Sequence, residues 1–275
     1  MEDILRALRI TAVITAAAVL LVTALMWGTT PSAGAGLTRV PAKTPFTKGH
    51  YYLYLQPWGG EDYWLTRWWS RYADAAVVDH KRFPSNTLIS WRWPPFPPRN
   101  GVGVWGYNAL SYGNYDGGAP EKPVAPVQVK NLKALNQTFA WSLSHRFGDA
   151  NVLTEFYLDP PTKPVTAHKI EIGFFLHTPD HTRRFFESAP TSVGQYVDTQ
   201  DRRWTVRMSG TFCMFAPEGY GDIQSGRIDM LHALRWLQVK GVVKGDEMFL
   251  GLAFGVEPVQ GTGRLKVDRW QVVMK

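Results

Sequence analysis

The sequence predicts an all-β protein in which two antiparallel sheets pack as a sandwich and a single helix packs against the outside. The main evidence is a series of short segments in which apolar and polar residues alternate between turn residues, as is typical of strands. These segments cover residues 51–55, 86–93, 126–132, 138–143, 151–158, 170–177, 204–208, 211–215, 248–256 and 263–274. Many short strands without intervening helices favour two packed sheets, and no repeat of fixed period indicates a propeller or a solenoid.

One segment has the spacing of a helix. Four apolar residues recur there at every third position, namely Ile228, Leu231, Leu234 and Leu237. Ser225 is a suitable N-cap before them, and Gly241 is a suitable stop after them. We therefore expect a helix over residues 228–239, packed across the outside of a sheet.

The first 35 residues have the features of a targeting segment. Arg6 and Arg9 precede an apolar run over residues 10–27, and a small-residue stretch that contains Ala33-x-Ala35 follows. The small residues suit a signal-peptidase site, whereas the apolar run is long enough to span a bilayer, so a cleaved signal peptide and an uncleaved membrane anchor are both open. In either case the remainder is expected to be secreted, periplasmic or held at the outer face of the cytoplasmic membrane.

Residues 36–49 contain two prolines and little apolar periodicity, and we interpret them as a linker. The folded domain is then expected over residues 50–275. A dense group of tryptophans near its start belongs either to the core or to a carbohydrate-binding surface, and consists of Trp58, Trp64, Trp68 and Trp69.

Composition narrows the class of function. The chain has 275 residues and a net charge of +7 that is scattered rather than gathered into blocks, which argues against a nucleic-acid partner. Cys213 is the only cysteine, so an intrachain disulfide is excluded, and its alternating segment predicts a buried position.

His177 and His181 flank a Thr-Pro-Asp turn without an evident third ligand, so no metal site is predicted. Because no phosphate-binding loop or Cys-x-x-Cys pair occurs, we expect no cofactor.

A row of small residues ends in a carboxylate near the C-terminus. One face of the strand over residues 249–257 carries Leu250, Leu252, Phe254 and Val256, and the other carries Gly251, Ala253, Gly255 and Glu257. A face of glycine and alanine packs poorly, which suggests room for a ligand beside the carboxylate. Glu257 would then suit general acid/base catalysis in a substrate cleft, for which a second carboxylate is needed as a partner.

Two further glutamates lie inside predicted strands. Glu171 shares its strand face with Gly173 and Phe175, and Glu155 lies within the strand over residues 151–158. A charged side chain inside an otherwise apolar strand is costly unless it is solvated in a cleft or paired. We therefore expect these glutamates and Glu257 to share one concave face.

Three motifs surround these glutamates: Glu171-Ile-Gly-Phe-Phe-Leu176, Gly255-Val-Glu-Pro-Val-Gln-Gly261 and Asn151-Val-Leu-Thr-Glu155. They resemble the motifs that carry the nucleophile, the acid/base and the supporting carboxylate of family 12 glycoside hydrolases, the endoglucanases and xyloglucanases built on a β-jelly roll. Ser90-Trp-Arg-Trp93, Arg203-Trp-Thr205 and the Ser225-Gly start of the predicted helix extend the resemblance.

The resemblance implies a jelly roll with a concave cleft, and an exported endo-β-1,4-glucanase that hydrolyses cellulose-like, mixed-linkage or xyloglucan chains with retention. It implies that Glu171 is the nucleophile, Glu257 the acid/base and Glu155 the supporting carboxylate, where the family has an aspartate. Gly173 and Phe175 replace a methionine and a tryptophan of the family, so a wider cleft floor is expected.

Four aromatic residues are candidates for stacking against sugar rings, because the apolar faces of pyranoses suit flat aromatic surfaces: Trp91, Trp93, Trp204 and Phe175. A polysaccharide is the expected partner, and we expect a monomer. The alternative, from another class of protein, is a membrane-tethered jelly roll that binds polysaccharide without cleaving it. The changes at Gly173 and Phe175 favour this alternative, whereas three retained carboxylates argue against it.

Overall fold

The structure, a computed structural model, describes residues 34–60, 74–99, 101, 103–161 and 170–275, together with Thr11 and Val13. Within these residues, no helix has both the length and the apolar character that crossing a membrane requires. The predicted signal peptide or anchor lies almost entirely outside them, as do Trp64, Trp68 and Trp69.

Strands dominate the described part of the chain, which confirms the predicted all-β class. The strands are β1 (Leu37–Pro41), β2 (Phe46–Lys48), β3 (Tyr51–Gln56), β4 (Ala75–Asp79), β5 (Thr87–Arg92), β6 (Tyr107–Gly113), β7 (Val127–Gln128), β8 (Leu135–Asp159), β9 (Ile170–His177), β10 (Thr191–Val197), β11 (Arg203–Ser209), β12 (Phe212–Pro217), β13 (Ser225–Asp229), β14 (Met248–Phe249) and β15 (Gly251–Met274). The helices are α3 (Asp180–Ser188) and α4 (Met230–Val239), with short 3-10 helices η1 (Trp58–Gly60), η2 (Tyr115–Gly117), η3 (Val129–Asn131) and η4 (Glu218–Tyr220).

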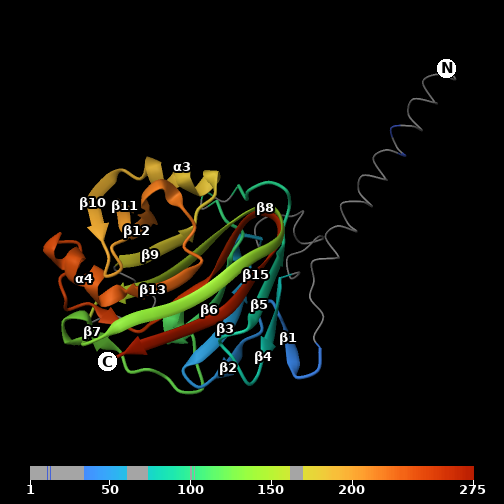
Figure 1. Cartoon of the computed structure of the whole chain (residues 1–275), viewed down its shortest axis with the longest axis horizontal. Helices are drawn as coiled ribbons and strands as arrows, with labels where there is room; N and C mark the ends of the chain where they lie inside the picture. The colour runs from blue at the N-terminus through green and yellow to red at the C-terminus, as the bar shows by residue number, and fades with distance from the viewer. Residues whose placement is uncertain are drawn as a thin grey trace.

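Two long strands, β8 and β15, connect the layers of the sandwich (Figure 1). They are antiparallel partners along most of their length, and register shifts after Pro258, Thr262 and Val267 mark bulges, which bend and twist a strand. The first part of β15 pairs with β6, and its later part, residues 262–267, pairs with β5. Each of these long strands therefore combines two segments that the sequence pattern suggested as separate strands.

The two layers follow from this pairing. The layer that carries the cleft contains, in order, β2, β3, β6, the first part of β15, the second part of β8, β9, β12, β11 and β10. The outer layer contains β1, β4, β5, the later part of β15, the first part of β8 and β13. Among the described strand pairs, only β9 and β12 are parallel.

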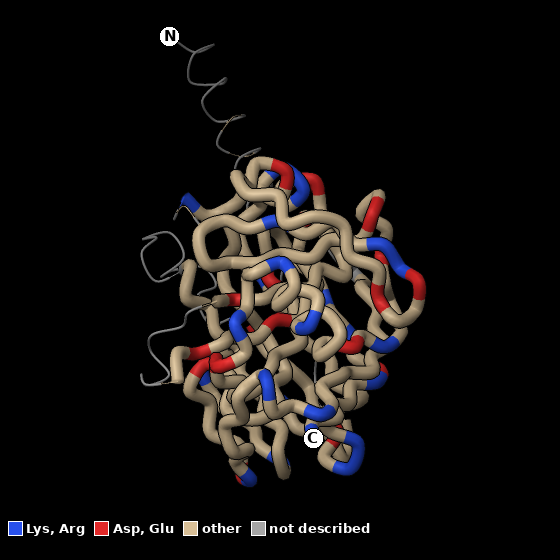
Figure 2. The backbone as a smooth tube through the Cα atoms, turned by 90° about the vertical axis from the view of Figure 1, so that its left-hand side faces the viewer, with Lys and Arg blue, Asp and Glu red and all other residues tan. Residues whose placement is uncertain are grey.

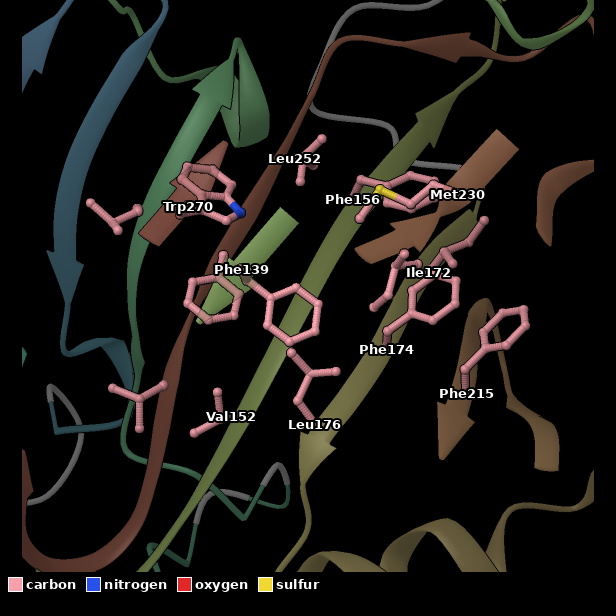
Figure 3. Close-up of a cluster of buried hydrophobic side chains, with 14 of the residues drawn as sticks. Phe139, Val152, Phe156, Ile172, Phe174, Leu176, Phe215, Met230, Leu252 and Trp270 are labelled. Carbon is pink, nitrogen blue, oxygen red and sulfur yellow. The ribbon is translucent and has the colours of Figure 1, made fainter. Parts of the chain in front are cut away.

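Large apolar side chains fill the space between the layers (Figure 3). The ring centroid of Phe254 lies 5.9 Å from that of Phe139 and 6.0 Å from that of Trp270. Each such buried side chain stabilises the fold by about 1.5–3 kcal/mol relative to an exposed one. Cys213 is also fully buried, as predicted, and burial raises the pKa of its thiol to about 12.

The prediction of a linker over residues 36–49 is wrong, because this segment contains β1 and β2. β1 pairs with β4 from Leu37, opposite Asp79, to Pro41, opposite Ala75. It is an edge strand, where a proline is tolerated because the unpaired side needs no N–H donor. The two prolines therefore did not mark a tether.

The structure corrects the predicted helix and adds a second one. Residues 225–229 are strand β13, and α4 begins at Met230. Its N-cap is Asp229 rather than Ser225, since the Asp229 carboxylate accepts the backbone N–H of His232 at 3.1 Å. Helix α3 follows Pro179 in the segment where only a turn was expected. Figure 1 shows both helices on the side of the molecule that carries β9–β13.

Positively and negatively charged residues are interspersed in the fold. Lys and Arg positions lie among Asp and Glu positions along the backbone drawn in Figure 2, without a large region of one sign. This distribution agrees with the scattered charges of the sequence.

Candidate active site

A cavity of about 1200 Å³ opens along the concave layer. Residues of β2, β3, β6, β15, β8, β9 and β12 form its floor, and η1, η2 and α3 contribute to its walls. Neighbouring strands lie about 4.8 Å apart, so a floor of seven strands is roughly 30 Å across. Because the volume exceeds the roughly 300–1,000 Å³ usual for small-molecule pockets, the cavity suits an extended ligand.

Three neighbouring strands each place one glutamate on this floor. In the ladders, Glu257 of β15 lies opposite Asn151, Glu155 of β8 lies opposite Ala253, and Glu171 of β9 lies opposite Tyr157. Because residues two apart on a strand share a face, these pairings put the three glutamates on the same face of the layer. All three line the cavity. The structure thus brings together the residues that the sequence singled out.

The three carboxyl groups interact electrostatically. Burial raises the pKa of Glu257 to about 7, although the amide of Asn151 opposes the rise. Burial also raises the pKa of Glu171 to about 7, and the charge of Glu257 adds to the effect. The pKa of Glu155 lies well above its usual value because of burial and then the charges of Glu171 and Glu257. Since like charges in a desolvated site do not all ionise, the cluster retains protons near neutral pH.

Two hydrogen-bond donors hold Glu155 and Glu257. The Tyr115 hydroxyl donates to Oε1 of Glu155. Asn151 donates from Nδ2 to Oε2 of Glu257 at 3.0 Å, and Thr182 of α3 donates in turn to Oδ1 of Asn151 at 2.5 Å. Tyr115, Asn151 and Thr182 were not predicted as site residues. They are ordinary polar residues in sequence, and only the pairing of distant strands brings them to the glutamates.

The glycines beside Glu257 do not leave open space. A Cβ atom at Gly255 would lie 2.2 Å from the backbone oxygen of Asn108, and one at Gly251 would lie 2.3 Å from that of Tyr112. Both neighbours belong to β6, so the glycines permit close approach of two backbones. The prediction that these glycines leave room for a ligand is therefore wrong.

The expected wider floor at Gly173 is also occupied. A Cβ atom there would lie 2.8 Å from Cε2 of Phe212, which β12 contributes. The ring of Phe212 lies 6.1 Å from that of Phe175, and both residues line the cavity. An aromatic side chain from the next strand thus fills the volume that a larger residue at position 173 would take. Phe175 is at the cavity as predicted, although only 2% of its surface is exposed.

Trp91, Trp93 and Trp204 do not line the cavity. All three are exposed by 1% or less and belong to the core between the layers. Trp93 stacks on Trp105 with centroids 5.1 Å apart, and Trp204 donates its indole N–H to Asp198 at 2.9 Å. The prediction that these tryptophans stack against sugar rings is wrong, because their side chains are buried in the core between the layers.

Other aromatic residues line the cavity instead: Tyr52, Tyr54, Trp58, Tyr107, Tyr115, Tyr157, Phe185 and Phe212. The sequence analysis left open whether Trp58 belongs to the core or to a carbohydrate-binding surface, and the structure places it at the cavity. A signal for two of the tyrosines existed, since Tyr52 and Tyr54 alternate with Leu53 and Leu55 in β3.

Helix α3 forms a wall that was not expected. Five of its residues line the cavity, namely His181, Thr182, Arg184, Phe185 and Ser188.

The two histidines that the sequence analysis considered as metal ligands have different surroundings. His181 lines the cavity, whereas Nδ1 of His177 lies 2.7 Å from Oδ1 of Asp222. Within the described ranges, no group of three or more His, Cys, Asp or Glu residues is placed to hold a metal ion.

The fold and this site define a β-jelly roll whose concave layer carries an acidic, aromatic-lined cleft. Solved structures of family 12 glycoside hydrolases share this fold. The chain is 16% identical to the family 12 endoglucanase 3 of Trichoderma harzianum, with a TM-score of 0.67 over 89% of this chain and 100% of the other. It is 16% identical to the family 12 xyloglucanase of Bacillus licheniformis, with a TM-score of 0.68 over 86% of this chain and 100% of the other.

A metagenome-derived family 12 endoglucanase has the same arrangement at 12% identity, with a TM-score of 0.66 over 87% of this chain and 99% of the other. Neither a protein-family model nor a curated protein sequence matches the chain. The jelly-roll prediction is confirmed, and the fold is that of the family 12 glycoside hydrolases.

Proposed function

We propose that this protein is a glycoside hydrolase that cleaves β-1,4-linked glucan chains internally and with retention of configuration. The observation that carries the proposal is the cluster of three interacting glutamates on the floor of an aromatic-lined cleft. Proteins with the same fold are endoglucanases and xyloglucanases, which supports a β-glucan as the substrate.

Exposure supports a division of roles within the cluster. Glu171 and Glu257 are partly exposed to the cleft, whereas Glu155 is only 4% exposed. A group that attacks or protonates the substrate must reach it, so Glu171 and Glu257 take these two roles. Glu155 acts on its neighbours, since its charge interacts with both of them.

Glu171 is the nucleophile in this proposal, and Glu257 is the general acid and base. The Glu171 carboxylate forms a bond to the anomeric carbon while the bond to the leaving oxygen breaks, and Glu257 transfers its proton to that oxygen. In the second step, Glu257 removes a proton from the water that displaces Glu171 from the sugar. Burial supports the first step, because a pKa raised to about 7 keeps a proton on Glu257 near neutral pH.

Glu155 and Tyr115 support the nucleophile. The Tyr115 hydroxyl donates to Glu155, which fixes the orientation of that carboxyl group. Glu155 then orients Glu171 and shares its proton. The charge of Glu171 is the second largest cause of the raised pKa of Glu155, after burial, which is consistent with a shared proton.

The proposal also includes the location of the protein, outside the cytoplasm. Two arginines before an apolar run over residues 10–27 support export, with the domain beyond the cytoplasmic membrane. N-terminal sequencing of the exported protein distinguishes a cleaved signal peptide from a retained anchor. Recovery of the intact chain in the cytoplasm would contradict export.

Hydrolysis assays with the variants Glu171→Gln and Glu257→Gln test the assigned roles. With soluble β-glucan or xyloglucan, each substitution should lower kcat/KM by about 10³-fold or more, which corresponds to about 4 kcal/mol. Glu187→Gln is the matched control, because Glu187 is exposed on α3 and does not line the cavity. Undiminished hydrolysis by either cleft variant contradicts the roles.

The anomer of the first product tests the mechanism. Proton NMR of a fresh digest should show the β-anomer before mutarotation, and initial formation of the α-anomer would contradict double displacement. If the protein binds β-glucan but forms no new reducing ends between about pH 4 and 8, the result contradicts hydrolysis and supports the alternative, a protein that binds polysaccharide without cleaving it.

A further inference from the structure

Contacts with the sheet region fix helix α3 and give one of its hydroxyl groups a defined position. Thr182 and Phe186 lie four residues apart on the buried face of α3, with 4% and 1% of their surfaces exposed. The ring of Phe186 lies 5.9 Å from that of Tyr220, and the Arg207 guanidinium donates to the backbone oxygen of Ala189 at 2.7 Å. Rotation of α3 would break these contacts.

The Thr182 hydroxyl begins a chain of hydrogen bonds that ends on a cleft carboxylate. It donates to Oδ1 of Asn151 at 2.5 Å, and Asn151 donates from Nδ2 to Oε2 of Glu257 at 3.0 Å. Asn151 is 2% exposed, so water does not compete for its amide. A donor at the amide oxygen and an acceptor at the amide nitrogen polarise the group in the same sense, which strengthens the bond to the carboxylate.

We propose that Thr182 is a positioning residue that orients Asn151 and, through it, sets the proton affinity of Glu257. Thr182 need not touch the substrate for this role. The inference rests on the proposed function, in which Glu257 transfers the proton. It also gives α3 a part in the chemistry beyond that of a wall.

Loss of the hydroxyl group should favour the protonated form of Glu257. With valine at position 182, the buried oxygen of Asn151 has no donor, and its amide is less firmly held against the carboxylate. Other titratable groups share the cavity and do not change in this variant: Glu155 and Tyr157 on β8, Glu171 on β9, Tyr107 on β6, Tyr115 and Asp116 on η2, Tyr52 and Tyr54 on β3, and His181 and Arg184 on α3. A difference between variant and wild type therefore reports the Thr182 contact.

Carbon-13 NMR of the labelled glutamate carboxyls tests the proposal directly, with Glu257→Gln to assign the signal. Thr182→Val should raise the apparent pKa of Glu257 by up to about one unit, because it weakens the Asn151 hydrogen bond to the charged carboxylate without removing it. Thr182→Ser, which keeps the hydroxyl, should restore the wild-type value. An equal pKa in Thr182→Val and wild type overturns the proposal, and Thr182→Ala provides the same comparison if the valine variant does not fold.

The pH profile of hydrolysis separates this role from a structural one. The alkaline limb of kcat/KM should move upward by the same amount in Thr182→Val and return in Thr182→Ser. Reduced activity with an unmoved limb would show a merely structural role and overturn the proposal. If the wild type hydrolyses no glucan, the proposed function fails, whereas the NMR titration still decides whether Thr182 acts on Glu257.

Discussion

Replacement of Glu171 by glutamine should make the fold more stable at alkaline pH. The buried carboxyl has its pKa raised from 4.5 to about 7, so the folded chain binds this proton more tightly than the unfolded chain. Its contribution to stability is therefore complete below about pH 4.5 and is lost as the pH rises through about 7. At 1.36 kcal/mol per pKa unit, the ionised group costs the fold up to about 3 kcal/mol at pH 8.

Solvent in the cleft and coupling to Glu257 reduce this cost, so we expect Glu171→Gln to gain about 1–2 kcal/mol at pH 8. Urea unfolding of both proteins at several pH values measures the difference, which should vanish near about pH 4. Glu218→Gln, at an exposed position on η4, controls for the chemical change alone. Parallel pH–stability curves for Glu171→Gln and wild type would refute the reasoning.

Four further substitutions test the lining of the cleft and the packing behind it. Trp58→Ala should raise KM for β-glucan with a stability change within about 0.5 kcal/mol, because Trp58 is partly exposed at the cavity. Trp204→Ala, in the core, should instead destabilise by about 3–5 kcal/mol. Kinetics and urea unfolding separate the two, and an unchanged KM in Trp58→Ala would exclude a platform there. Gly255→Ala should destabilise by about 1–3 kcal/mol, since its Cβ would lie 2.2 Å from the Asn108 oxygen; an unchanged urea midpoint is the contrary result. Phe212→Ala should raise kcat/KM on xyloglucan relative to unsubstituted β-glucan, because space beside the nucleophile opens; an equal ratio would remove Phe212 from the specificity determinants.

The sequence predicts the acidic face because a charged side chain inside an apolar strand is costly unless it is solvated in a cleft or paired. Glu155, Glu171 and Glu257 each interrupt an apolar alternation, and a shared cleft accounts for all three. The partners of these residues could not be predicted in the same way. Asn151 lies opposite Glu257 only through the register of β8 against β15, and no short sequence pattern displays the pairing of strands so far apart in the chain.

The tryptophans show where a local pattern and a resemblance pointed in different directions. Trp91 and Trp93 alternate with Arg92, and the alternation alone places both indoles inward, opposite a charged residue. Their resemblance to a cleft-lining pair suggested the outer face. The structure follows the alternation, with Arg92 partly exposed and both tryptophans in the core.

Helix α3 was missed because it is short and mostly polar, with Phe185 and Phe186 as its only apolar residues. Over its nine residues, the buried face includes the polar Thr182 with Phe186, while Phe185 is exposed toward the cleft. The preceding Thr-Pro reads equally well as a turn, although proline is also common at helix starts. Tertiary contacts, such as that of Phe186 with Tyr220, therefore decide the local structure here.

The long strands β8 and β15 have a consequence for how the molecule opens. Because both belong to the two layers at once, neither layer can detach without breaking hydrogen bonds of the other. The floor of the cleft and the outer wall should therefore unfold as one cooperative unit, with backbone amides of both exchanging at similar rates. The short helices η1 and η2 border the cleft outside this shared ladder, so a local opening there would leave its floor intact.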